Sequence, residues 1–152
     1  MFLDTAFLKT DEIFLRLDKT SEGNPARNWV PAYYFTIMNH SGEELGSCDL
    51  RIGHNEQTYF GGNIGYAVHE QHRGHHYATK ACLLLFELAR RHGLGHLIIT
   101  CNPDNTPSRR TCERLGGILL EIADLPEDTD MYARGERKKC IFRVNIKKRT
   151  DQ

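Results

Sequence analysis

Apolar and polar positions alternate along the first half of the chain, a pattern typical of strands with one buried face. Residues 13–18 alternate in this way and predict a first strand. Residues 19–31 are polar and contain two prolines, so they cannot hold a long helix. Further strands are predicted at residues 33–38, 45–52 and 63–68. The Asn-His-Ser-Gly segment at 39–42 supplies turn residues, which indicates a hairpin.

The periodicity changes to that of a helix after residue 77. Apolar residues recur at i, i+3, i+4, i+7 and i+11 from position 78, namely Ala78, Ala81, Cys82, Leu85 and Ala89. This spacing places them on one wide face, so we predict a largely buried helix. Basic residues at 90–92 suit the negative end of the helix dipole, and Gly93 supplies a C-terminal stop.

A second helix and three strands follow. Residues 97–101 form a short apolar run that predicts a buried strand, and a turn follows at 102–105. Thr106 is a candidate N-cap with Pro107 at the first helical position, and glycines 116 and 117 end that helix. Strands are predicted at residues 118–123 and 140–146, separated by a long charged loop at 124–138. The fold class is therefore mixed α+β, with a central, mostly antiparallel sheet and two central helices.

Length and composition are those of one globular domain spanning residues 1–152, with no internal repeat. The 20 basic and 20 acidic side chains cancel, which argues against nucleic-acid binding by bulk charge. No apolar run approaches the roughly 20 residues that cross a bilayer, so we expect no membrane partner. The five cysteines are odd in number and form no C-x-x-C pair, which favours a reducing, cytoplasmic location.

The segment before the first helix is the strongest candidate for chemistry. A strand ends near Val68, and a short loop then leads into the helix. A helix N-terminus presents unpaired N–H groups and a partial positive charge, so it readily holds an anion. Arg73 adds a full charge, and Gly74 allows the backbone to approach a ligand closely. From physics alone this loop is a candidate phosphate site, and an ordinary strand–helix turn is the alternative.

Two motifs resemble those of the GNAT superfamily of N-acetyltransferases. The segment from Val68 to Ala81, with Arg73-Gly74-x-x-Tyr77-Ala78 at its centre, resembles their acetyl-CoA pyrophosphate loop. Downstream, Asn105-x-x-Ser108-x-x-x-x-Glu113-x-Leu115-Gly116 resembles their second signature, and the order of the two motifs agrees with that family. The chain departs from the pattern at His76, where the family usually has glycine, and at Gly117, where an aromatic residue is common. A histidine fits a helical N1 conformation at position 76 but adds bulk against the diphosphate.

The resemblance implies a GNAT-like fold and acetyl-CoA as co-substrate, with no metal. The cofactor would lie where the strand ending at Val68 splays from the strand at 97–101. Its phosphates would be held by the loop and its arm by strand backbone groups, with further contacts from the second motif. The implied cofactor-binding residues are Tyr66, Ala67, Val68, Arg73, Gly74, His75, His76, Tyr77, Ala78, Asn105 and Ser108.

Direct attack of an amine on the thioester needs an acid for the leaving thiolate. In many family members this acid is a tyrosine four residues after the position of Ser108, which here is Cys112. A thiol with an ordinary pKa of about 8.5 can donate a proton, although burial in the core is the simpler role for it. Tyr132, on the loop that borders the acceptor site in the family, is the competing candidate. The base is left open between His69 and proton loss through water.

The acceptor implied by the resemblance is a primary amine of a small molecule or peptide. The stretch before residue 33 is too short for the two helices that usually wall the acceptor site, so the site should be open or completed by a second subunit in a homodimer. Acidic residues at 127, 128 and 130 could attract an amine or be a solvated loop.

Two other functions stay open. A non-catalytic acyl-CoA-binding module with this fold is favoured by His76 and by the missing tyrosine. A metal-dependent enzyme would use the clustered histidines, namely His69, His72, His75 and His76.

Overall fold

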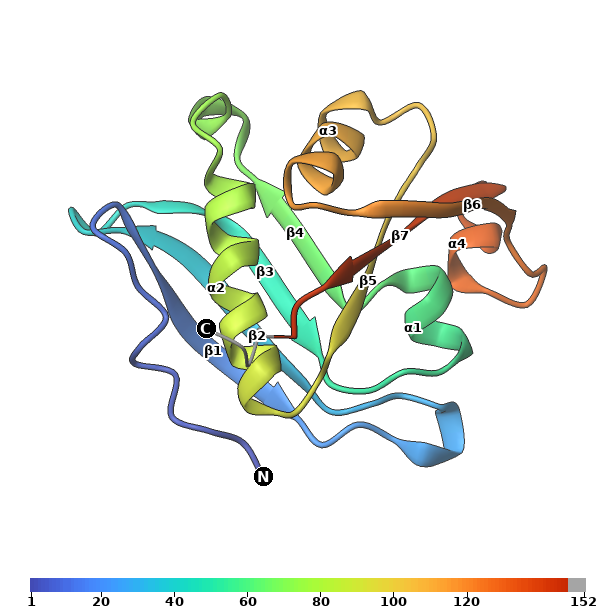
Figure 1. Cartoon of the computed structure of the whole chain (residues 1–152), viewed down its shortest axis with the longest axis horizontal. Coiled ribbons are helices and arrows are strands. Elements are labelled where there is room, and N and C mark those ends of the chain that lie inside the picture. The colour runs from blue at the N-terminus through green and yellow to red at the C-terminus, as the bar shows by residue number, and fades with distance from the viewer. Residues whose placement is uncertain (148–152) are drawn as a thin grey trace.

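Two antiparallel sheets lie side by side in the computed structural model, which describes residues 1–147 (Figure 1). The first sheet contains, in spatial order, β1 (Ile13–Ser21), β2 (Ala32–Asn39), β3 (Glu44–Arg51) and β4 (Ile64–Val68). The second contains β5 (His96–Cys101), β7 (Lys138–Asn145) and β6 (Ile118–Asp124). The last five residues of the expected single domain lie outside the described residues.

Helices pack on these sheets and connect them. The long helix α2 (Tyr77–Arg91) crosses one face of the first sheet, and α3 (Thr106–Arg114) follows β5 (Figure 1). Two short helices, α1 (Glu56–Gly61) and α4 (Asp130–Ala133), precede β4 and β7 respectively. Single 3₁₀ turns occur at Pro25–Arg27 and Glu70–His72. The predicted mixed α+β fold class is confirmed. The strands form two antiparallel sheets in place of the one central sheet that was expected.

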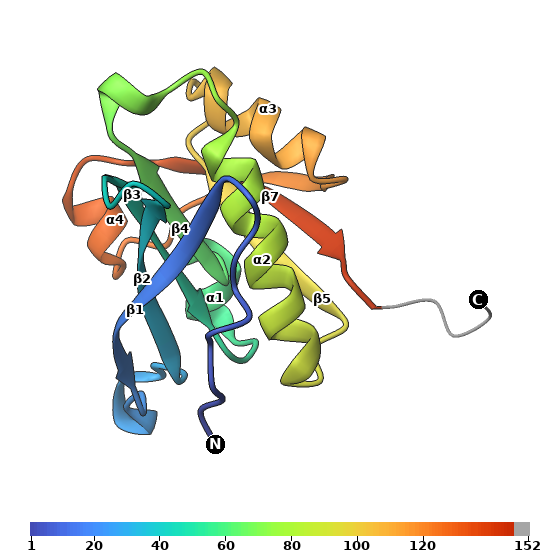
Figure 2. The ribbon, with the colours of Figure 1, turned by 90° about the vertical axis from the view of Figure 1, so that its left-hand side faces the viewer.

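The core forms between α2 and the inner faces of the strands. The predicted apolar face of α2 is buried there, and its Leu85 and Leu88 meet Tyr33 and Phe35 of β2 in one cluster. Burying a leucine side chain contributes roughly 1.5–3 kcal/mol, so this face holds the helix in place. On the outer side of α2 the N-terminal segment runs alongside it (Figure 2), and Glu12 forms an ion pair with Lys80 there, at 2.6 Å.

Three local predictions need correction. The first strand continues past residue 18 to Ser21, because a bulge between Leu17 and Lys19 restores its pairing with β2. The N-cap of α3 is Asn105 rather than Thr106, since the Asn105 side chain accepts the Ser108 N–H at 3.2 Å. Helices α1 and α4 were not expected. A reciprocal capping box between Asn55 and Thr58 nucleates α1.

Asn63 connects the two sheets at the start of β4. Its backbone N–H donates to the Ile98 carbonyl at 2.7 Å, and its side-chain oxygen accepts the Ile98 N–H at 2.8 Å. Its side-chain nitrogen donates to the carbonyls of Arg51, at 3.1 Å, and Gly53, at 2.8 Å. In the described residues no strand ladder joins β4 to β5 beyond this point, so the two strands diverge from Asn63 onwards.

We predict that Asn63→Ala destabilises the fold by about 2–4 kcal/mol, because it leaves a buried N–H and two carbonyls without their side-chain partner. Asn145→Ala is the matched control: this asparagine is exposed on β7, and we expect a change below about 0.5 kcal/mol. Urea unfolding of the two variants measures the difference. Equal free energies of unfolding for both would contradict the role assigned to Asn63.

Candidate functional site

The N-terminus of α2 is an open anion cradle. The first N–H groups of the helix have no carbonyl one turn earlier to bond, and in the described structure the His76 side chain makes no capping hydrogen bond to them. The loop before them is exposed at Arg73, Gly74 and His75. Arg73 donates its Nε–H to the Val68 carbonyl at 3.4 Å, which keeps its charge beside the helix end. Positive potential is therefore concentrated at this loop.

Two residues of the loop have left-handed backbone conformations. Gly74 has φ +92°, and open space surrounds the position of a side chain there. His76, the N-cap, has φ +60° and ψ +28°. The expected helical conformation for His76 is wrong: the chain must turn left-handed at this residue to direct the N–H groups of the helix outward. Glycine adopts this conformation without strain, which is the physical reason that it is usual at this position.

The edge of β4 that faces β5 carries unpaired backbone groups. In an antiparallel ladder, pairs with and without mutual hydrogen bonds alternate. The His69 N–H donates to the Leu45 carbonyl, and the Arg51 N–H donates to the Asn63 carbonyl. Odd-numbered residues of β4 therefore point their backbone groups at β3. Tyr66 and Val68 point theirs away from β3, into the space that opens beyond Asn63.

Side chains from β4 and α3 meet across this opening. The Tyr66 hydroxyl lies 2.7 Å from the Ser108 hydroxyl, in the first turns of α3. Burial raises the pKa of Tyr66 above its usual range. Asn105 holds the start of α3 through its capping bond to the Ser108 N–H. The structure thus places Tyr66, a predicted cofactor-binding residue, opposite Asn105 and Ser108 of the second motif, across one gap.

Two buried polar atoms near this gap lack a hydrogen-bond partner among the described residues. One is the Thr79 hydroxyl oxygen, in the first turn of α2, and the other is the side-chain oxygen of Asn102, directly after β5. Unsatisfied buried groups are rare and call for an explanation, and a bound polar molecule is one. Together with the uncapped α2 N-terminus and the free β4 edge, they fit a ligand that has an anionic head and an extended polar arm.

The two candidate acids lie in different environments. The Cys112 side chain is fully buried and hydrogen-bonds the Cys101 thiol, which, together with its burial, keeps the pKa of Cys112 above its usual range. Gly117, the other departure from the family pattern, packs behind it: a side chain at 117 would meet the Cys112 carbonyl at 2.7 Å. Tyr132 lies half-buried on α4, with the Arg137 guanidinium over its ring at 3.7 Å.

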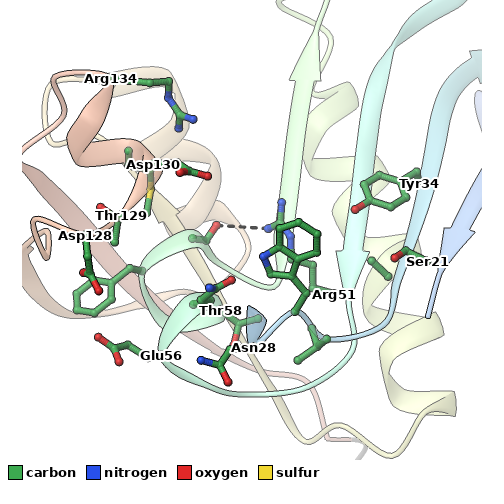
Figure 3. Close-up of a pocket in the computed structure, with 17 residues that line it drawn as sticks. Ser21, Asn28, Tyr34, Arg51, Glu56, Thr58, Asp128, Thr129, Asp130 and Arg134 are labelled. Carbon is green, nitrogen blue, oxygen red and sulfur yellow. Dashed lines mark hydrogen bonds between the residues drawn. The ribbon is translucent and has the colours of Figure 1, made fainter. Parts of the chain in front are cut away.

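A pocket of about 570 Å³ opens at the other end of β4, on the face of the first sheet opposite α2 (Figure 3). Three segments that are far apart in the chain wall it, at residues 21–34, 51–61 and 128–134. Arg51 lies between Tyr34 on one side and Asp130 and Arg134 on the other (Figure 3). Trp29, which is 49% exposed, adds an aromatic surface.

The unpaired charges of the pocket are negative. Arg51 donates to the carbonyls of Gly61, at 3.5 Å, and Gly62, at 2.8 Å, and it lies 3.5 Å from a carboxylate oxygen of Asp49. Arg134 forms an ion pair with Glu136 at 3.2 Å. Three acidic side chains of the lining have no ion pair within residues 1–147, namely Glu56, Asp128 and Asp130. Such a pocket attracts a cation.

The histidine cluster does not converge on one point. Among the described residues no group of three or more histidine, cysteine, aspartate or glutamate side chains is arranged to hold a metal ion. His72 lies 4.0 Å from a Glu43 carboxylate oxygen, whereas His75 packs beside the Tyr77 ring. None of the five cysteines, all in the described part of the chain, forms a disulfide. No described helix is long and apolar enough to cross a membrane.

Sequence reasoning missed much of this site. Asn63, Arg51 and Trp29 belong to no motif, and Glu56 lies on the unexpected helix α1. Only the Asn55-x-x-Thr58 spacing, a capping signal, points to a helix there. Asp128 and Asp130 were named as possible amine-attracting groups, and both line the pocket, whereas Glu127 does not.

Comparisons with known proteins add a family and a fold. The model of an acetyltransferase (GNAT) domain matches residues 8–118. No curated protein matches the sequence. One similar solved structure is a Vibrio cholerae protein described as a ribosomal-protein-serine acetyltransferase; identity is 19%, the alignment covers 94% of this chain and 99% of that one, and the TM-score is 0.66.

Two further structures are RimL and MccE. RimL, a ribosomal L7/L12 α-N-protein acetyltransferase, is 18% identical over 92% of this chain and 97% of its own, with a TM-score of 0.66. MccE, a microcin C7 self-immunity acetyltransferase in complex with acetyl-CoA and AMP, is 22% identical over 75% of this chain, with a TM-score of 0.59. The chain spans 61% of MccE and 66% of a GNAT-family acetyltransferase from Bacillus anthracis. At these identities the likeness establishes the fold alone.

We predict that His76→Gly stabilises the protein by about 0.5–1 kcal/mol, because it removes left-handed strain at the N-cap. His75→Gly is the matched control. His75 has no positive φ, so added backbone freedom should destabilise that variant by up to about 1 kcal/mol. Chemical unfolding of both variants measures the difference, and a loss of stability in His76→Gly would contradict the strained conformation.

Proposed function

Because the chain belongs to the acetyltransferase (GNAT) family, we propose that it is an N-acetyltransferase that transfers an acetyl group from acetyl-CoA to a primary amine of a small molecule or peptide. Transfer occurs by direct attack within a ternary complex. One observation carries the proposal: the anion cradle of α2 and the acidic pocket lie at opposite ends of the same strand, β4. Five strand residues span about 17 Å, a length suited to an extended arm between the two ends.

The described residues fit the co-substrate along this strand. The N–H groups of residues 73–78 would hold its phosphates, with the charge of Arg73 beside them. Backbone groups of Tyr66 and Val68 would pair with its arm, and Asn105 and Ser108 would line the other side of the gap. MccE, which shares the fold, is described as a complex with acetyl-CoA. When bound, acetyl-CoA supplies an acetyl group activated as a thioester.

The acidic pocket is the proposed acceptor site. Asp128, Asp130 and Glu56 attract a protonated amine, and Trp29 and Tyr34 offer aromatic faces to its carbon chain or its charge. The amine must lose its proton before it attacks. His69 is exposed at the far end of β4, beside the cradle, so we propose that the proton leaves through water in the open pocket.

The proposal includes a cellular location and an oligomeric state. Five buried free thiols support a reducing compartment, the cytoplasm. A homodimer is supported by four exposed apolar side chains on the edge strand β6, namely Ile118, Leu119, Leu120 and Ile122. We propose no nucleic-acid partner, since the formal net charge is zero.

Acetyl-CoA at a hundred times its Kd should raise Tm by about 5–10 °C, because it binds the native state alone. Arg73→Ala should weaken this binding about tenfold, because a charge-assisted contact to phosphate is lost. Arg143→Ala, an exposed arginine on β7, is the control and should bind as the parent protein does. If saturating acetyl-CoA does not raise Tm, the proposed function is wrong. Binding without turnover of any amine would favour a non-catalytic acyl-CoA-binding module.

Asp128→Asn and Asp130→Asn should each raise KM for a cationic amine about threefold to fivefold, because each removes one attractive charge from the pocket. kcat should change less. Glu127→Gln removes a neighbouring charge outside the pocket lining and should leave KM unchanged. Steady-state kinetics on the best amine from a panel of diamines, amino sugars and peptides measures these effects. Equal KM values for all three variants would exclude this pocket as the acceptor site.

A further inference from the structure

Breaking a thioester by an amine releases a thiolate, and this leaving group needs a proton source within the gap. The question rests on the proposed function and concerns which side chain supplies the proton. Cys112 is fully buried, with its thiol hydrogen-bonded to Cys101. Tyr132 lies beneath the Arg137 guanidinium on α4 and is not part of the pocket lining. Neither side chain belongs to β4, the strand whose edge opens into the gap.

Tyr66 does lie at that edge. It is the middle residue of the β4 segment beyond Asn63, and its backbone groups point into the opening. Its half-buried side chain reaches to α3, where its hydroxyl lies 2.7 Å from Ser108 Oγ. Thr111 and Cys112 lie close enough to this hydroxyl to influence its pKa. The Tyr66 hydroxyl thus occupies the wall of the gap at the turn of α3 that contains Cys112.

We propose that Tyr66 is the general acid of this enzyme. The tyrosine hydroxyl comes from β4 rather than from α3, and α3 carries a small residue at the facing position. The position four residues after Ser108 is a cysteine, whose side chain is smaller than that of a tyrosine. The Tyr66 ring and the small Cys112 side chain are therefore complementary features of one wall.

The proton balance of the step closes within this network. As the C–S bond breaks, its electron pair goes to sulfur, and the Tyr66 hydroxyl proton passes to that sulfur to give a thiol. The Tyr66 phenolate then regains a proton through the Ser108 hydroxyl. Ser108 relays this proton from water, which has taken up the proton that the amine lost, so no other reactant is needed. At neutral pH the Tyr66 hydroxyl carries its proton. Burial raises its pKa and weakens it as an acid, whereas the hydrogen bond with Ser108 lowers the pKa and stabilises the phenolate that the transfer leaves.

The kinetic test compares Tyr66→Phe with Tyr59→Phe. Each variant loses one tyrosine hydroxyl, but the Tyr59 hydroxyl bonds Glu121, away from the gap. Tyr66→Phe should lower kcat about 100-fold or more while KM for acetyl-CoA stays within about threefold, because the ring and the backbone are retained. Tyr59→Phe should keep kcat. An unchanged kcat in Tyr66→Phe with an active parent enzyme overturns the assignment and leaves the proposed function intact.

A binding test needs no turnover. The Tyr66 hydroxyl should hydrogen-bond the thiol of free CoA, so the parent protein should bind CoA about fivefold more tightly than desulfo-CoA. Tyr66→Phe should bind the two ligands equally, whereas Tyr59→Phe should keep the preference. If Tyr66 had only a structural role, Tyr66→Phe would weaken the binding of CoA and desulfo-CoA by the same factor and keep the preference for CoA. That result would overturn the proposal. If the parent protein binds neither acetyl-CoA nor CoA, the proposed function itself fails.

Discussion

The carboxamide of Asn63 is the constraint on which the site depends. It joins the two sheets through three side-chain hydrogen bonds and one backbone hydrogen bond, all at the start of β4. Because this clamp acts at one end only, β4 and β5 can separate towards their other ends without losing register with β3 and β7. A gap with unpaired strand edges is normally a liability, since such edges recruit other strands. Here the helices α2 and α3 flank the gap and restrict what can enter it.

Opposite charges at the two ends of β4 follow from this geometry. The strand feeds directly into α2, so the positive end of that helix must lie at the wide end of the gap. At the narrow end, the carbonyls of Gly61 and Gly62 engage Arg51 and leave the nearby carboxylates uncompensated. Although the formal net charge is zero, the two ends of β4 therefore carry electrostatic potentials of opposite sign. Under the proposed function, an anionic co-substrate and a cationic acceptor would each be drawn to a different end and would not compete for one site.

Local patterns predicted the strands and the two long helices, but not the short helices α1 and α4 or the features that depend on long-range contacts. The face of α2 could be read from apolar spacing, because helix periodicity and burial agree over its whole length. The Asn105 cap was misplaced by one residue because Thr106 offers the same chemistry, and only the bond to the Ser108 N–H distinguishes them. The pocket could not be predicted, since its walls come from three segments that are separate in the chain. Asn63 has no local signature either, because its three partners lie on other elements.

The loop at residues 73–78 and the Tyr66 side chain each show how the structure accommodates a departure from a sequence motif. At His76 an imidazole is held at φ +60°, where glycine would be unstrained. At Cys112 the residue type changes, and a hydroxyl reaches the same wall from β4. In both cases a ligand would contact a chemical group at a given place, whichever residue of the chain supplies that group. A departure from a motif therefore weakens a functional assignment only when no facing element restores the missing group. Under the proposal that Tyr66 is the general acid, β4 supplies this group, and a cysteine on α3 is then compatible with catalysis.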